Sequence, residues 1–274
     1  MFRTRVISSV VLVILALVTI LGGGYLLAAT LLFLALVAYR ELMKACKLSG
    51  EAKKFSPLEI NGYLGILAYY LVMVFVPDRI YLFLTVVLIL IGFMFIYVFS
   101  FPKYHSDQIM SAFFCVAYAP VMLSFIYLVR ALPYGVYTVW MIFISSWICD
   151  TCAYLTGICI GKHKLAPVLS PKKSIEGAIG GILGSAIVGA LYGYFVVESV
   201  VVEQNITWVF VVISAVGAVI SQVGDLAASA IKRNQEIKDY GKLIPGHGGV
   251  MDRFDRVIFT APMIYFLTLL LIRA

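Results

Sequence analysis

Long apolar runs separated by short polar segments make up most of the chain. Because a transmembrane helix needs about 20 consecutive apolar residues, each run of that length predicts one membrane span. The first run, residues 6–39, is too long for one span, and Gly22, Gly23 and Gly24 predict a tight turn that divides it into two. Seven further runs bring the prediction to nine spans: about 60–76, 80–99, 109–130, 136–157, 177–197, 207–230 and 255–272.

Composition supports the same fold class. Hydrophobic residues make up 62% of the chain and charged residues only 13%, whereas a soluble domain carries about 25% charged residues. Soluble globular, disordered and disulfide-stapled proteins are therefore excluded. The five cysteines are an odd number in mostly apolar surroundings, and the Cys149-x-x-Cys152 pair has no second pair downstream, which favours unpaired thiols over a zinc or redox site. We expect an all-α polytopic membrane protein.

The basic residues predict the orientation of the chain in the membrane. With nine spans, eighteen of the 21 Lys and Arg residues fall on the side shared by the N-terminus and the loops after spans 2, 4, 6 and 8, and only Arg79, Arg130 and Arg273 fall on the other. Cytoplasmic loops carry an excess of Lys and Arg. We therefore expect an integral protein of the cytoplasmic membrane with its N-terminus inside and its C-terminus outside.

Span 7 is rich in glycine, with small residues at the four-residue spacing of closely packed membrane helices. Internal helix packing explains this pattern, and a homodimer formed through the glycine-rich face is the alternative.

Two carboxylates interrupt apolar spans near their predicted cytoplasmic ends: Asp150 and Asp225. An unpaired carboxylate costs several kcal/mol in such a place, so each needs a cation or a proton. Ser221 and Ser229 lie on the same helical stripe as Asp225, and hydroxyls beside a carboxylate suit a hard cation such as Mg²⁺. A buried salt bridge to a nearby Lys or Arg is the structural alternative.

The predicted loop between spans 6 and 7 carries four lysines in twelve residues. It is not a P-loop, because only three residues separate Gly157 from Gly161-Lys162 where four are required. Lys172 and Lys173 can neutralise phosphoryl oxygens. Ordinary positive-inside charge or attraction to anionic lipid explains the same lysines.

A second charged segment, residues 229–256, follows span 8. Its glycines let the backbone approach a ligand closely. Asp252 and Asp255 are three residues apart and alternate with Arg253 and Arg256, a composition expected where a metal-bound polyphosphate sits. Alternatively, either Asp simply caps the last helix. Both charged loops return to the same predicted side, so one site can use both.

At this segment the sequence resembles the phosphatidate cytidylyltransferases, also called CDP-diacylglycerol synthases. The resemblance rests on Ser229-x-Ile-Lys232-Arg233-x₄-Lys238-Asp239-x-Gly-x₂-Ile-Pro-x-His247-Gly248-Gly249-Val-x-Asp252-Arg253-Phe-Asp255. An upstream pattern, from Asp150 through Gly161-Lys162-His163-Lys164-Leu165 to Ser170-Pro-Lys172-Lys173-Ser174-x-Glu176-Gly177, is also similar, except that Ser174-Ile175 stands where Thr-Trp is common. The similarity covers about residues 140–256.

The resemblance implies the reaction of CTP with phosphatidate to give CDP-diacylglycerol and pyrophosphate. Because CTP is highly charged and the acyl tails of phosphatidate stay in the bilayer, we expect an open polar cavity at the cytoplasmic membrane boundary, walled by spans 6, 8 and 9 with a lateral opening to lipid. The resemblance also implies one or two divalent cations, Mg²⁺ in the first place, with a monovalent cation as a further option and no nucleic-acid partner. Residues 1–135 would form the N-terminal spans 1–5, and residues 136–274 the catalytic part with loops 158–176 and 232–253. The predicted catalytic residues are Asp225, Asp252, Lys172, Lys173 and Arg253. The predicted metal ligands are Asp225, Asp252 and Asp150. The predicted substrate-binding residues are Ser170, Lys232, Arg233, Lys238, Asp239, His247, Gly248, Gly249 and Asp255.

Two alternatives stay open from the residues alone. A cation-coupled carrier of anionic solutes would use Asp150 and Asp225 as its ion site, although such carriers often show matching broken helices in both halves. A cytidylyltransferase acting on another lipid phosphate would show the same polar residues, because apolar helices accept any lipid tail.

Overall fold

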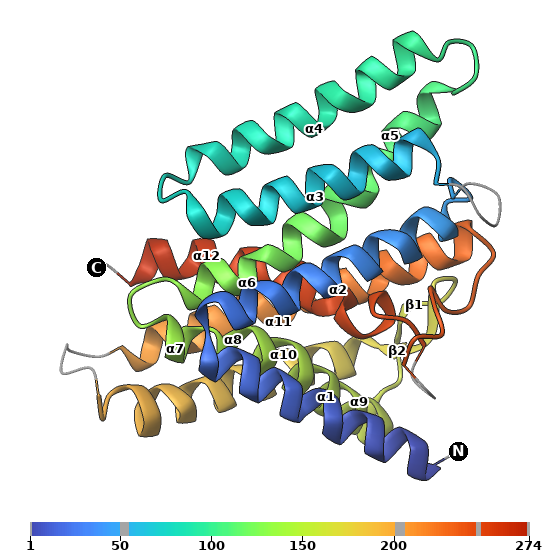
Figure 1. The fold of residues 1–274 in the computed structure, drawn as a ribbon. Helices are drawn as coiled ribbons and strands as arrows, with labels where there is room; N and C mark the ends of the chain where they lie inside the picture. Colours follow the sequence, from blue (N-terminus) through green and yellow to red (C-terminus); the bar gives the residue numbers. More distant parts are fainter. Residues whose placement is uncertain (1, 50–54, 201–205, 245–247, 273–274) are drawn as a thin grey trace. The chain divides into compact units, whose positions relative to one another are not determined.

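The structure is a computed structural model that describes residues 2–49, 55–200, 206–244 and 248–272. Within these residues, helices account for nearly all regular structure (Figure 1). The helices are α1 (Phe2–Gly22), α2 (Gly24–Ala45), α3 (Pro57–Phe75), α4 (Ile80–Phe99), α5 (Ser106–Val116), α6 (Met122–Arg130), α7 (Gly135–Thr138), α8 (Trp140–Phe143), α9 (Cys149–Ile160), α10 (Ile175–Tyr192), α11 (Thr207–Asn234) and α12 (Met251–Leu271). Short π-helical turns η1 (Ala117–Val121), η2 (Ile144–Ile148) and η3 (Gly193–Val197) extend or join some of them.

The described residues contain eight helical segments long and apolar enough to cross a membrane, and a shorter apolar helix covers Val10–Gly22. The eight are Gly24–Ala45, Pro57–Phe75, Ile80–Phe99, Ser106–Arg130, Gly135–Ile160, Ile175–Val197, Thr207–Asn234 and Met251–Leu271. The predicted all-α polytopic membrane fold is confirmed, and each predicted span matches one of these nine helical segments.

The division of the first apolar run is also confirmed. Helix α1 ends at Gly22 and α2 begins at Gly24. Gly23 and Gly24 have φ values of 59° and 48°, in the left-handed region that glycine enters without the steric cost of a Cβ. The backbone therefore reverses within three residues, as a hairpin of two membrane helices requires.

The chain forms two compact units. Unit 1 comprises Met1–Tyr127 and Gln235–Arg253, and unit 2 comprises Leu128–Asn234 and Phe254–Ala274. Each unit is described by itself below. The functional division into residues 1–135 and 136–274 stays a prediction.

In unit 1, helices α2, α3, α4 and α5 pack together around large buried side chains. Tyr39 of α2 is fully buried, and its hydroxyl donates a hydrogen bond of 3.2 Å to the carbonyl of Leu58 in α3. The ring lies against Gly62, where any Cβ would collide with it. Burial of the phenol is thus combined with a satisfied hydroxyl.

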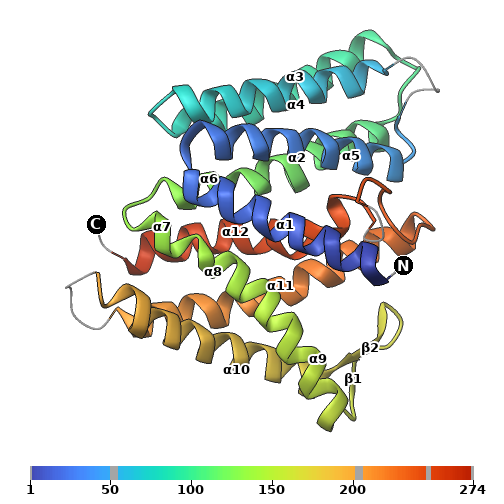
Figure 2. The ribbon, with the colours of Figure 1, turned by 60° about the horizontal axis from the view of Figure 1, so that its bottom comes forward.

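In unit 2, α10 packs against both α9 and α11 (Figure 2). Gly180 and Gly184 face Thr156 and Cys152 of α9, and Gly189 faces Ser214 of α11. A Cβ at any of these glycines would overlap its neighbour. The helices can therefore approach this closely only because glycine has no side chain. The glycines of span 7 therefore serve packing within the chain, and the alternative role in a homodimer stays a prediction.

A two-stranded antiparallel hairpin connects α9 to α10: β1 (Lys164–Ala166) pairs with β2 (Ser170–Ser174) (Figure 2). The sequence predicts a cytoplasmic loop over residues 158–176, so the hairpin is an addition to the predicted fold, and α9 continues to Ile160. Ser174 ends the hairpin and begins α10, because its hydroxyl accepts a hydrogen bond of 3.2 Å from the backbone N–H of Gly177.

Candidate active site

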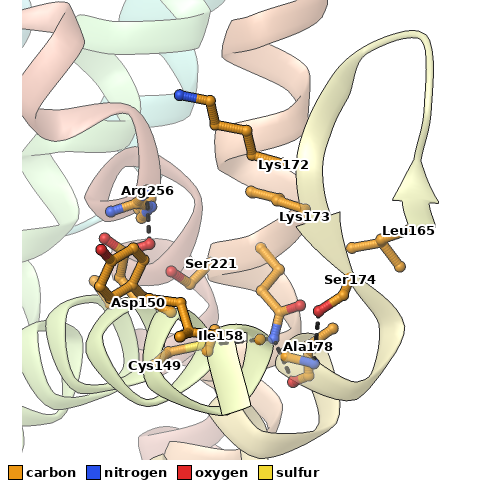
Figure 3. A pocket seen from close by; sticks show the side chains of 16 residues that line it. Cys149, Asp150, Ile158, Leu165, Lys172, Lys173, Ser174, Ala178, Ser221 and Arg256 are labelled. Atoms are coloured by element: carbon orange, nitrogen blue, oxygen red, sulfur yellow. Dashed lines mark hydrogen bonds and ion pairs between the residues drawn. The ribbon is translucent and has the colours of Figure 1, made fainter. Parts of the chain in front are cut away.

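A pocket of about 400 Å³ lies within unit 2, where the β1–β2 hairpin meets α9, α10, α11 and α12 (Figure 3). This volume is within the range of small-molecule sites, about 300–1,000 Å³. The lining residues are Ser146, Cys149, Asp150, Ala153, Tyr154, Gly157, Ile158, Leu165, Lys172, Lys173, Ser174, Gly177, Ala178, Ser221, Gln222 and Arg256. We call this cavity the Asp225 pocket, because Asp225 forms ion pairs with two of the lining residues.

Both intramembrane carboxylates are paired with cations at this pocket. Arg256 of α12 places Nη2 at 2.9 Å from Oδ1 of Asp150 and at 3.3 Å from Oδ2 of Asp225. Lys173 of β2 forms a second ion pair with Asp225. The structural alternative considered for these carboxylates, a salt bridge to a nearby cation, is therefore present in the structure. A role as metal ligands stays a prediction.

The two carboxylates differ in their surroundings. The side chain of Asp225 is 14% exposed, whereas that of Asp150 is 52% exposed. Removing charge from water is costly, so the more buried carboxylate depends more on its two cations. Asp225 is the more buried carboxylate and has two cationic partners, whereas Asp150 is more exposed to solvent and pairs with Arg256.

The lining of the pocket has an excess of positive charge. Lys172 also lines the pocket (Figure 3). Among the described residues its ammonium forms no ion pair. The lining of the pocket thus contains three cations, Lys172, Lys173 and Arg256, and one carboxylate, Asp150. This composition favours an anionic ligand such as a phosphate.

A buried hydroxyl in the pocket wall has no partner. Ser221 lies one turn before Asp225 on α11 and is 1% exposed, and its Oγ makes no hydrogen bond among the described residues. Some hydroxyls in the spans are satisfied by the carbonyl four residues earlier, as Thr268 is by Ile264 at 2.7 Å, but Ser145, which does not line the pocket, is unpartnered as well in the described part of the chain. Figure 3 shows the Ser221 hydroxyl on the side of its helix that faces Asp150 and Arg256. An unsatisfied buried hydroxyl costs about 1–3 kcal/mol, and Ser221 differs from Ser145 in lining the pocket, where a ligand can satisfy it.

One rim of the pocket is apolar. Tyr154 and Ile158 of α9 line it and are 68% and 64% exposed. They lie within a helical segment apolar enough to span a membrane. A ligand with a phosphate at one end and hydrocarbon at the other matches this combination of surfaces.

The hairpin that carries the two lysines is tied to α10 at its base. Glu176 accepts a hydrogen bond of 3.1 Å from the backbone N–H of Lys162, and its Oε1 lies 2.5 Å from Nδ1 of His163. The carboxylate thus joins the end of α9 to the start of α10. Glu176 follows closely after β2, the strand that carries Lys172 and Lys173.

The part of the charged segment around Asp252, Gln235–Arg253, belongs to unit 1. Asp252 Oδ2 accepts hydrogen bonds of 2.9 Å from the N–H of Tyr240 and 3.0 Å from the N–H of Gly249. The side chain therefore reaches back from the first turn of α12, as the third residue of a capping box does. Asp252 therefore lies inside the first turn of α12 and is not its N-cap, although its carboxylate does bind backbone N–H groups at the helix start. Its role as a cation ligand stays a prediction.

The predicted site residues are distributed as follows. Asp150, Asp225, Lys172 and Lys173 come together at the Asp225 pocket. Ser170 begins β2 without lining the pocket, and Asp255 is buried in α12. Lys232 and Arg233 end α11, and the loop that follows belongs to unit 1 with Lys238, Asp239, Gly248, Gly249, Asp252 and Arg253. His247 lies outside the described residues.

Most residues that line the pocket were missing from the predicted set, and two of them, Arg256 and Ser221, matter for its chemistry. Arg256 was noted in the charged segment as one of the cations that alternate with the carboxylates. Ser221 was noted on the same helical face as Asp225. Neither was predicted to be a site residue. The spacing of Ser221 to Asp225 was the available signal for the serine. No spacing in the sequence shows that Arg256 contacts Asp150, 106 residues earlier.

The donor set fits a magnesium ion that shares its coordination with a substrate. Among the described residues, no group of three or more His, Cys, Asp or Glu side chains is placed to hold a metal ion. Mg²⁺ is usually held by one or two carboxylates, with waters and substrate phosphates as the other ligands. Asp225 and Asp150, which share one guanidinium nitrogen, supply carboxylate oxygens of that kind.

Comparison with known proteins gives the family. A sequence model described as "Cytidylyltransferase family" matches residues 3–271. The chain belongs to the cytidylyltransferase family. The protein named phosphatidate cytidylyltransferase in Staphylococcus epidermidis is 34% identical to it over 267 residues, which cover 96% of this chain and 97% of the relative. Proteins of the same name from Staphylococcus aureus strain COL and Staphylococcus saprophyticus are 33% and 32% identical, with the same coverage.

Membership in the cytidylyltransferase family extends over the whole chain, whereas the motifs in the sequence covered only about residues 140–256. The N-terminal spans therefore belong to the family's common architecture.

Proposed function

We propose that this protein is a phosphatidate cytidylyltransferase: it transfers the cytidylyl group of CTP to phosphatidate and releases pyrophosphate. The Asp225 pocket carries the proposal, because it combines a surplus of cations with an exposed apolar rim inside membrane helices. Membership in the cytidylyltransferase family and the names of the relatives support the same reaction.

The chemistry requires positioning and charge neutralisation. The phosphate monoester of phosphatidate has a second pKa near 6, so at pH 7 its oxygen is already nucleophilic and no general base is needed. This oxygen attacks the α-phosphorus of CTP, a new P–O–P bond forms, and the bond from the α-phosphorus to the bridging oxygen breaks. The electron pair leaves with pyrophosphate. The enzyme's part is to hold the two phosphates in line and to compensate their charge.

The pocket residues have distinct roles in this proposal. Lys172, Lys173 and Arg256 bind phosphoryl oxygens. The carboxylate of Asp225, assisted by Asp150, would hold Mg²⁺, which supplies charge neutralisation between the phosphates when bound. Ser221 gives a neutral donor at the same wall. We further propose that Asp252 is a second cation ligand, and that Arg253, Lys232 and Arg233 take up charge on the nucleotide phosphates.

The orientation in the membrane follows from the charge distribution. We propose that the N-terminus and both charged loops are cytoplasmic and the C-terminus is outside, because CTP carries about four negative charges and is available only in the cytoplasm, while the acyl chains of phosphatidate stay in the bilayer at about 0.8 kcal/mol per CH₂ group. A homodimer remains compatible with this arrangement.

A series of acceptors tests the proposed substrate. Purified protein is incubated with CTP labelled at the α-phosphate and with phosphatidate, an isoprenoid glycerol phosphate or soluble glycerol 3-phosphate. We expect labelled lipid with phosphatidate and little product with the soluble acceptor, which lacks the apolar part that the rim binds. Preference for the isoprenoid phosphate would assign the enzyme to another lipid, and the absence of product with every acceptor would contradict the reaction.

A further inference from the structure

Unit 1 contains a buried carboxylate whose function the reaction does not explain. Glu41 lies in the last full turn of α2 and is only 6% exposed. A charged side chain is costly in such a place unless hydrogen bonds or a counter-charge satisfy it. The hydrogen-bond partners of Glu41 therefore indicate its role.

Glu41 binds the backbone at the start of α12. Its Oε1 accepts a hydrogen bond of 3.0 Å from the N–H of Val250, and its Oε2 accepts one of 2.9 Å from the N–H of Met251. The first N–H groups of a helix have no partner inside the helix, and their partial positive charge attracts an anion. A side chain more than 200 residues earlier thus caps the helix on which Asp252 and Arg253 lie.

Two glycines of the segment Gln235–Arg253, Gly241 and Gly249, leave space for the Glu41 carboxylate. A Cβ on Gly249 would meet Oε1, Oε2 and Cδ of Glu41 as its three nearest atoms, all closer than atoms approach without overlap. A Cβ on Gly241 would also collide with Oε1. Neither glycine has a positive φ that would itself demand glycine. Both positions are therefore restricted by Glu41 and not by their own backbone.

Asp252 is held by the same segment. Its Oδ2 accepts hydrogen bonds from the N–H groups of Tyr240 and Gly249, the direct neighbours of the residues that surround Glu41. Glu41 fixes the helix start at residues 250 and 251, and Asp252 follows at the next position. A shift of this turn would move the Asp252 carboxylate directly.

We propose that Glu41 is a positioning residue for the cytidylyl transfer: from the N-terminal spans, it holds the first turn of α12 and so sets the place of Asp252. The proposal rests on the proposed function of Asp252. It also gives the N-terminal spans a specific part in the site, beyond anchoring the chain in the membrane.

Hydrogen exchange tests the positioning itself, independently of activity. The variants are Glu41→Ala and Glu41→Gln, and the control is Glu59→Gln, which alters a buried carboxylate that caps α3 through Ser56. In both Glu41 variants we expect faster exchange in a peptide covering residues 248–256, and in the control we expect the change near residues 56–60 instead. Unchanged exchange at residues 248–256 in Glu41→Ala would overturn the proposal.

Kinetics test the consequence for the reaction. We expect kcat to fall about 10-fold or more in Glu41→Ala and less in Glu41→Gln, which retains one acceptor, while the Mg²⁺ concentration for half-maximal activity rises and the KM for phosphatidate changes less than 3-fold. A purely structural role would lower the amount of active protein without moving the Mg²⁺ requirement. If the wild-type protein forms no product, the proposed function fails, and the exchange experiment still decides on Glu41.

A double variant protects the test against simple misfolding. Gly249→Ala alone introduces a collision with Glu41, and we expect it to lower kcat at least 10-fold. In the Glu41→Ala background the three nearest atoms that a Cβ on Gly249 would meet are removed, so the same change should lower kcat clearly less than it does in the wild type. Equal losses in both backgrounds would show that Gly249 is restricted by something other than Glu41 and would contradict the proposed contact.

Discussion

The guanidinium of Arg256 and the carboxylate of Asp225 form an ion pair, with 3.3 Å between Nη2 and Oδ2. The same nitrogen contacts Asp150 at 2.9 Å. One arginine therefore balances two carboxylates that stand in membrane helices of widely separated sequence. A cation or phosphate that enters the pocket must share these groups, so the ion pairs connect the stability of the site to ligand binding.

Replacement of Arg256 by Met should reduce both stability and turnover. Asp225 keeps Lys173 as a counter-charge, but Asp150 loses its ion-pair partner. Loss of a charged hydrogen-bond partner in a partly buried place costs about 1–3 kcal/mol. We expect a lower Tm and at least a 10-fold loss of kcat. Lys103→Met, a change in the exposed loop after α4, is the control and should leave both values unchanged.

Asp225→Asn should abolish turnover while the protein still inserts and purifies. The amide is uncharged and cannot replace a carboxylate as a strong ligand for a hard cation. Product formation is the measurement, and the matched control is Asp107→Asn, an exposed carboxylate in the first turn of α5. Activity near that of the wild type at ordinary Mg²⁺ would refute the role of Asp225.

Ser221→Ala should weaken substrate binding without lowering stability. The hydroxyl has no partner in the described part of the protein, so its removal eliminates an unsatisfied group and should leave Tm unchanged or slightly higher. We expect a rise of about 3- to 10-fold in the KM for CTP or phosphatidate. Ser145 is an equally buried and unpartnered serine that does not line the pocket. Ser145→Ala should leave both KM values unchanged, and the same rise in both variants would argue against a ligand at Ser221.

Cysteine labelling should place both charged loops on the cytoplasmic side. Lys164 and Lys242 are exposed, and Val200 is exposed in the segment that follows η3. In a background with the five native cysteines replaced, an impermeant thiol reagent added to intact cells should label Val200→Cys but neither Lys164→Cys nor Lys242→Cys. Labelling of Lys164→Cys without Lys242→Cys would separate the two loops and contradict a shared site.

Sequence alone predicted most of the fold, because a membrane imposes a simple rule on length and hydrophobicity. The turn at residues 22–24 and all nine helical segments followed from that rule. The hairpin at residues 164–174 was missed because Pro167 and Pro171 are typical of an irregular loop. The π-helical turn at Ala117–Val121 was missed because local hydrogen-bond geometry leaves no mark on hydropathy.

The site was predicted in its residue types and missed in its long-range partners. Asp225, Lys172 and Lys173 stood out because charge in or beside an apolar span is unusual. Arg256 and Glu41 did not, because each acts on residues far away in the chain, and a single sequence contains no information on which helices pack together. Glu41 in particular was indistinguishable from the solvated charges that commonly end a span.

The most direct test of the central claim is transfer of label from α-labelled CTP into lipid by purified protein, with Asp225→Asn alongside the wild type. Phosphatidate is the acceptor, and each protein is assayed with Mg²⁺ and with a chelator in its place. We predict labelled CDP-diacylglycerol and an equal amount of pyrophosphate only from the wild type with Mg²⁺. Equal product formation in the chelator, or by Asp225→Asn, would contradict a magnesium-dependent cytidylyl transfer at the Asp225 pocket.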